Sequence, residues 1–130
     1  MNMKLSIIFT ALLLSTSCST TENDLPITQP GSRYPFVTTT RDGGLLMSWF
    51  EKTDSVNWAL KWSEFKEGNW SDNPPITNGE PYFVNWADFP SIFHAGGDTL
   101  VAHWLQKSGQ GLYDYDVKVV LSFDRGATWS

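Results

Sequence analysis

The sequence is short of cysteine, of basic residues and of long apolar runs, and each shortage excludes a class of protein. Its one cysteine, Cys18, excludes an internal disulfide, so packing must stabilise the folded part. Nine Lys and Arg residues stand against fourteen Asp and Glu, and the basic residues do not cluster. A surface that neutralises phosphates needs clustered basic residues, so we predict no nucleic-acid partner. We also predict no cofactor and no metal site.

The N-terminal segment has the pattern of an export signal. A positive start precedes an apolar run, residues 5–14, which is too short to span a bilayer as a stable anchor. Small residues then lead to Cys18, and the segment resembles the lipobox of bacterial lipoproteins, with Leu14 one position further from the cysteine than is usual. The resemblance implies a signal peptide over residues 1–17 and a lipid on Cys18. That lipid would anchor the exported chain at the bacterial cell envelope, on the outer membrane or facing the periplasm; ordinary secretory cleavage is the alternative.

A polar segment separates this signal from the aromatic remainder of the chain. Residues 19–32 contain Pro26, Pro30 and Gly31 and cannot bury enough apolar surface to fold. We therefore predict that residues 18–32 form a lipidated cysteine with a flexible tether. Residues 33–130 contain all seven tryptophans, which predicts a folded segment.

An internal repeat organises the folded segment. Residues 34–53 align with residues 89–108, and both copies open on an aromatic–proline step before a Gly/Asp turn. After a four-residue insertion in the second copy, residues 63–71 align with residues 122–130. Tandem repeats with a period of this order are typical of solenoids and propellers.

The pattern within each copy predicts strands and no helix. Short apolar or alternating runs are separated by turn residues that suit tight hairpins. The predicted strands cover residues 36–40, 45–50, 58–63, 91–93, 100–105 and 117–122. One such sheet cannot bury both of its faces alone, so the copies are expected to stack. The predicted fold class is all-β.

The second copy ends in a motif that points to a family. Residues 122–129, SFDRGATW, resemble the Asp-box, S-x-D-x-G-x-T-W, of the sialidase and BNR-repeat families. The side chains of Ser122 and Asp124 can bond to backbone groups of a tight turn, and Gly126 permits a left-handed conformation. The ring of Trp129 is expected to tuck under the turn. The resemblance implies a structural role for these four residues and no role in catalysis.

The resemblance covers residues 33–130. It implies the first two blades, the second of them incomplete, of a sialidase-like β-propeller of about six blades. The chain would then be the N-terminal fragment of a longer bacterial lipoprotein.

The sialidase resemblance also implies catalytic residues. Sialidases grip the sugar carboxylate with three arginines and use a Tyr–Glu nucleophile pair with an aspartic acid as acid/base. Arg33 stands where the first arginine is expected, and Asp54 is the nearest stand-in for the acid/base. Lys52 lies near the expected place of the second arginine and cannot make the same two-pronged contact. The alternative for Arg33 is a solvated arginine where the tether meets the first strand.

Two further segments carry candidate substrate-binding residues. Trp86 and Asp88 precede the first strand of the second copy and could stack on a sugar and hydrogen-bond to it. The alternative is a plug between the two copies, with Asp88 capping a turn. Asp114 and Asp116 belong to an acidic, aromatic insertion before the third strand, which could reach a ligand.

Two functions follow as expectations. The first is a sialidase-like exo-glycosidase, a glycoside hydrolase scaffold acting on terminal sialic acid or another acidic sugar, with this chain alone inactive. The alternative is a non-catalytic propeller lipoprotein that binds glycans or a protein. Both predict a carbohydrate or protein ligand, and contact with the membrane through the lipid only. A fold of this kind hosts many functions, so the fold alone does not choose between them.

Overall fold

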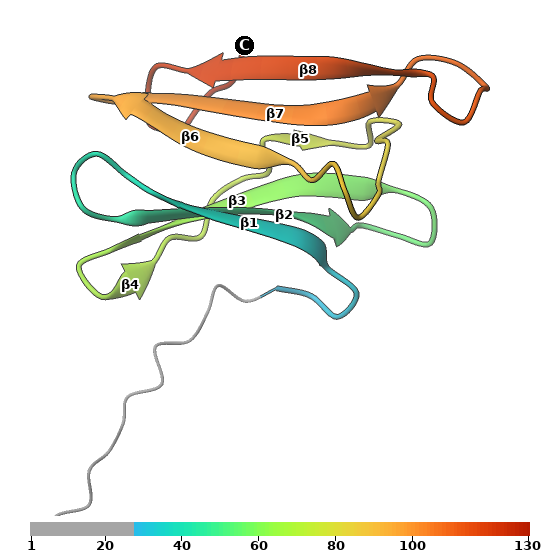
Figure 1. The fold of residues 1–130 in the computed structure, drawn as a ribbon. Coiled ribbons are helices and arrows are strands. Elements are labelled where there is room, and N and C mark those ends of the chain that lie inside the picture. The colour runs from blue at the N-terminus through green and yellow to red at the C-terminus, as the bar shows by residue number, and fades with distance from the viewer. Residues whose placement is uncertain (1–27) are drawn as a thin grey trace, which may run out of the picture.

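The computed structural model describes residues 28–130 (Figure 1). The predicted signal peptide, Cys18 and most of the predicted tether lie outside the described residues. Every regular element between residues 28 and 130 is a strand, and the sheets are antiparallel, so the all-β prediction is confirmed. Over the same residues, no helix has the length and apolar character needed to cross a membrane.

The first sheet contains five strands. In chain order they are β1 (Arg33–Thr39), β2 (Leu45–Lys52), β3 (Trp58–Lys66), β4 (Asn69–Trp70) and β5 (Thr77–Asn78). Strands β1 to β4 follow one another in space, and the short β5 pairs with β3 beside β4. Each neighbour in this sheet is thus reached by a short connection, as the turn residues of the sequence predict.

The second sheet repeats the first three strands. It contains β6 (Ser91–Gly96), β7 (Thr99–Lys107) and β8 (Tyr115–Ser122), in that spatial order. Figure 1 shows it stacked on the first sheet. Several strands are longer than predicted, because the ladders continue to the pairs Lys52–Trp58 and Lys107–Tyr115. The placement of Asp116 in the inserted loop is wrong, since this residue lies in β8 opposite Gln106.

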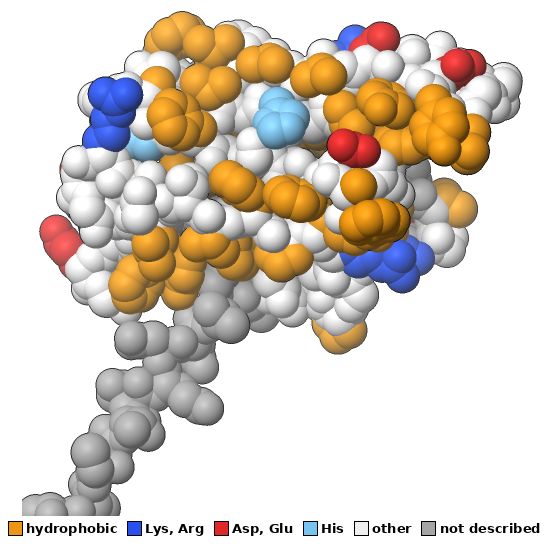
Figure 2. Space-filling view, viewed as in Figure 1, with side chains coloured by type: hydrophobic (Ala, Val, Ile, Leu, Met, Phe, Trp, Pro, Cys, Tyr) orange, Lys and Arg blue, Asp and Glu red, His pale blue; other side chains and the backbone are white. Residues whose placement is uncertain are grey.

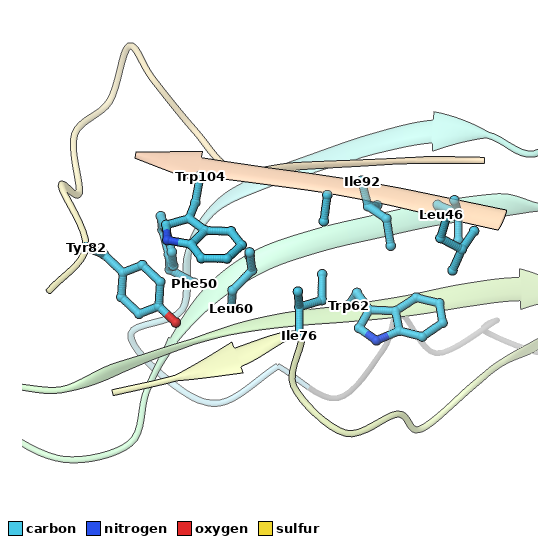
Figure 3. Close-up of a cluster of buried hydrophobic side chains, with 10 residues drawn as sticks. Leu46, Phe50, Leu60, Trp62, Ile76, Tyr82, Ile92 and Trp104 are labelled. Carbon is cyan, nitrogen blue, oxygen red and sulfur yellow. The ribbon is translucent and has the colours of Figure 1, made fainter. Parts of the chain in front are cut away.

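The core lies between the two sheets (Figure 3). Strands β2, β3, β6 and β7 and the segments around β5 supply its buried residues, which are Leu46, Phe50, Leu60, Trp62, Ile76, Tyr82, Ile92, Leu100, Ala102 and Trp104. Each fully buried large side chain of this kind contributes about 1.5–3 kcal/mol through removal of apolar surface from water. A polar bond accompanies this core, because the Ser48 hydroxyl of β2 donates to the carbonyl of Pro90, just before β6, over 3.2 Å.

The stacked sheets have two ends of different construction. We call the end with the tight turns 40–44, 67–68, 96–98 and 123–128 the turn end, on the left in Figure 1. The opposite end carries the segments 53–57, 79–90 and 108–114, and we call it the loop end. Strand register places the start of β1 at the loop end, because Arg33 pairs with Phe50.

The turn end is locked by an ion-pair network. The Arg125 guanidinium, which follows β8, donates to both oxygens of Glu64 on β3, at 3.0 and 2.5 Å. It also donates to Asp42 at 2.8 Å, and Lys66 contacts the same carboxylate at 3.0 Å. Hydrogen bonds to Glu64 and Asp42 raise the pKa of Arg125 above its ordinary value. The network therefore joins the turns of one sheet to those of the other.

The turn after β8 is held by its own side chains. The Ser122 hydroxyl accepts from the Gly126 amide at 2.7 Å, and Asp124 accepts from the Thr128 amide and hydroxyl at 2.8 and 2.6 Å. The bonds from Thr128 lower the pKa of Asp124 to about 2. The hydrogen bonds expected of Ser122 and Asp124 are thus present. Trp129 meets Trp62 of the first sheet edge-on, with ring centroids 6.0 Å apart.

Candidate functional site

The six residues predicted for catalysis or substrate binding all lie on segments of the loop end. They are Arg33, Asp54, Trp86, Asp88, Asp114 and Asp116. The turn of residues 122–129 lies at the opposite end. Antiparallel pairing has this effect, because the start of β1, the end of β2 and the start of β3 meet at one edge. The loop end is therefore the candidate functional site.

Trp58 is the centre of this site. It is the first residue of β3, and the ladder sets it opposite Lys52, the last residue of β2. The Nζ of Lys52 lies 5.3 Å from the centroid of the Trp58 ring, and the Cζ of Arg33 lies 5.9 Å from it. An indole face attracts cations at these distances. Among residues 28–130, neither Arg33 nor Lys52 forms an ion pair with a carboxylate, so both charges remain available to a ligand.

A pocket of about 440 Å³ opens beside Trp58. Segment 79–84 forms one of its walls and ties the two sheets together there. The Gly79 amide donates to the Trp58 carbonyl at 3.0 Å, and the Lys107 amide donates to the Pro81 carbonyl at 2.7 Å. The volume is within the range of small-molecule sites. Charged side chains on the lining are those of Glu80 and Lys107.

Tyr82 connects this pocket to the core. Its ring lies 4.8 Å from that of Phe50 and 6.4 Å from that of Trp104, measured between centroids. Burial raises the pKa of Tyr82 to about 12, so its phenol is neutral at physiological pH. The pocket therefore has a rigid, uncharged aromatic side chain on its inner side.

Asp54 is engaged within its own loop. One carboxylate oxygen accepts from the amides of Val56 and Asn57, both at 2.8 Å, and the other accepts from the Asn57 side chain at 2.7 Å. These bonds lower the pKa of Asp54 below its ordinary value, and the bond from the Val56 amide has the largest effect. A general acid of a glycosidase needs a raised pKa. The geometry gives Asp54 the surroundings of a loop-forming residue and not those of a proton donor.

Trp86 and Asp88 differ in their surroundings. The Asn85 side chain donates to Asp88 at 2.8 Å and accepts from the amides of Ala87 and Asp88, so these residues close a turn. The residue that caps this turn is Asn85, and Asp88 supports it by accepting from the Asn85 side chain. Trp86, however, is 82% exposed, so it does not act as a plug between the sheets. Its ring is free to contact a ligand.

The segment 108–114 presents a second exposed aromatic residue. Asp114 accepts from the Gly111 amide at 2.8 Å and so shapes the loop, while Tyr113 at the tip is 76% exposed. Asp116 points to Lys118, with 3.8 Å between carboxylate oxygen and Nζ. In Figure 2, apolar side chains reach the surface at the loop end, on the right, with basic side chains beside them.

No protein-family model matches the chain, and no curated protein matches it significantly. The resemblance to sialidases therefore depends on the repeat and on residues 122–129. Within residues 28–130, no group of three His, Cys, Asp or Glu side chains is placed to hold a metal ion.

Three residues of this end were not predicted as site residues from the sequence: Trp58, Glu80 and Lys107. The repeat contains a signal for Lys107, because residues 52–53 align with residues 107–108 and so make Lys107 the equivalent of Lys52 in the second copy. The structure brings Lys52 to Trp58 and places Lys107 on the pocket that Trp58 lines. Nothing in the local sequence singles out Trp58 or Glu80.

Proposed function

We propose that the loop end binds an acidic glycan, with terminal sialic acid or another sugar acid as its ligand. The observation that carries the proposal is the pair of cations, Arg33 and Lys52, held against Trp58. The cations suit a carboxylate, and exposed aromatic rings nearby suit the apolar faces of sugars.

We further propose that the two sheets are the first two blades of a sialidase-like propeller. The stacking supports this. The second sheet covers one face of the first sheet, and the equivalent face of the second sheet is its uncovered outer face. Leu60 in the first sheet is fully buried, whereas the corresponding Val119 in the second sheet is 55% exposed. Ser130 also exchanges two backbone hydrogen bonds of 2.9 Å with Leu121, as the start of a fourth strand would.

For the chain alone, we propose that it binds the acidic glycan without hydrolysing it. Arg33 favours a sialidase-type scaffold, but the lowered pKa of Asp54 does not favour an acid catalyst. We also propose export and display at the bacterial cell envelope through a lipid on Cys18. This part depends on the N-terminal sequence and lies outside the described residues.

The test is a calorimetric titration of the chain with sialyllactose and with lactose, the neutral core of the same glycan. We expect saturable binding of sialyllactose only, weakened by added salt because the contact is partly electrostatic. Arg33→Ala and Lys52→Ala should each lower affinity about tenfold or more, as loss of a charged hydrogen bond does. Lys118→Ala is the charge-matched control. Equal binding of lactose, or unchanged affinity in both variants, would refute the proposal.

Hydrolysis is tested separately with a fluorogenic sialoside. We expect no turnover by the chain alone. Turnover that disappears in Arg33→Ala and in Asp54→Asn would replace the binding function by a catalytic one.

A further inference from the structure

Two opposite charges on the pocket beside Trp58 have no partner within the described part of the chain. Glu80 is half-buried, Lys107 is exposed, and both line the cavity of about 440 Å³. Neither forms an ion pair with the other or with any other side chain of residues 28–130. Because the Glu80 carboxylate and the Lys107 ammonium do not pair with each other, a polar, uncharged ligand in the pocket can hydrogen-bond to both.

The lining restricts the chemistry of that ligand. A second acidic group would meet the Glu80 carboxylate, and a purely apolar ligand would remove both charges from water without compensation. A neutral pyranose satisfies all three parts of the lining. Its hydroxyls can donate to Glu80 and accept from Lys107, while one face of the ring is apolar and suits the indole of Trp58.

We propose that this pocket binds the penultimate, neutral sugar of the glycan whose terminal acidic sugar is held by Arg33 and Lys52. The inference rests on the proposed function. Trp58 connects the two positions, because its ring is contacted by both cations and also lines the pocket. The free volume of about 440 Å³ accommodates a single sugar ring.

The pocket is built before the ligand arrives. Segment 79–84 is bonded to β3 through the Gly79 amide and to β7 through the Phe83 amide, which donates to the Leu105 carbonyl at 2.8 Å. The Lys107 backbone is fixed by the same segment through Pro81. A preformed pocket loses little entropy on binding, so the second sugar should add measurable affinity.

The experiment compares free sialic acid with sialyllactose by calorimetry, on the wild-type chain and on variants. We expect sialyllactose to bind about tenfold more tightly than sialic acid. Glu80→Gln and Lys107→Ala should remove that gain and leave the affinity for free sialic acid unchanged. Glu67→Gln and Lys118→Ala, which change exposed charges elsewhere, should leave both affinities unchanged.

The alternative outcomes separate the two proposals. Equal affinity for the two ligands would overturn the second sugar position and leave the acidic-sugar position standing. Suppose that Glu80→Gln loses affinity for both ligands while its circular dichroism spectrum is unchanged. The second sugar position would then be overturned too, because Glu80 would belong to the site of the acidic sugar. Absence of binding by either ligand would overturn both proposals.

Discussion

At the scale of the residue, Gly126 is where the turn after β8 meets the first sheet. Its φ is +88°, and a Cβ at this position would overlap the ring of Trp62. Gly43 has a similar φ of +91° but has open space around it. Substituting each of these two glycines by alanine therefore distinguishes the free-energy cost of the left-handed backbone from the cost of the clash with Trp62.

We predict that Gly126→Ala lowers the free energy of unfolding by about 2–5 kcal/mol, the sum of backbone strain and overpacking. Gly43→Ala should cost about 1–2 kcal/mol, since it carries the backbone strain alone. Urea denaturation of the two variants measures both values. Equal losses would show that Trp62 does not constrain the turn.

Asp124 should make stability depend on acid pH. Bonds from Thr128 lower its folded-state pKa from 3.8 to about 2. A lowered pKa means that the stabilisation is present above the unfolded value and is lost as the pH falls through the folded value. Between pH 4 and pH 2 the stability of Asp124→Asn should therefore fall less steeply than that of the wild type. Thermal melts at several pH values measure the two slopes, and parallel slopes would contradict the assignment.

At the scale of the element, Arg125 joins the two sheets at the turn end. Its contacts with Glu64 and Asp42 are partly exposed, so each is weaker than a buried pair. We predict that Arg125→Ala lowers the free energy of unfolding by about 1–2 kcal/mol. Lys118→Ala, which removes only the exposed contact with Asp116, should change it by less than about 0.5 kcal/mol. Denaturant unfolding of both variants measures these two free-energy losses. Equal losses would show that the Arg125 network does not stabilise the contact between the sheets.

The elements show which features a sequence can predict. Period-two alternation and the repeat predict the strands, and residues 122–129 predict their own turn, because all the interactions involved are local. The contact between Arg125 and Glu64 joins residues far apart in the chain, so no spacing rule reveals it. The position of Trp58 beside Lys52 depends on the register of a hairpin, which the sequence leaves open. The ends of β2 and β7 were missed for the same reason.

At the scale of the whole molecule, the two ends differ in their chemistry. At the turn end, Arg125 joins Asp42 and Glu64 in an ion-pair network. The loop end keeps unpaired charges at Trp58 and presents exposed aromatic rings from two loops, Trp86 and Tyr113. Ligand recognition needs unsatisfied groups on a rigid support, and the loop end has them. The candidate residues of the sequence gather at this end through topology, although Asp54, Asp88 and Asp114 serve the loops themselves.

The most direct test that the loop end, and not the turn end, binds the ligand is a nuclear magnetic resonance titration. The isotope-labelled chain is titrated with sialyllactose. We predict saturable shifts at the backbone amides of Arg33 and Lys52 and at the Trp58 indole. Residues 122–129, at the turn end, should not shift. Saturable shifts confined to the turn end, or no saturable shift at Trp58, would contradict the claim that the loop end is the binding site.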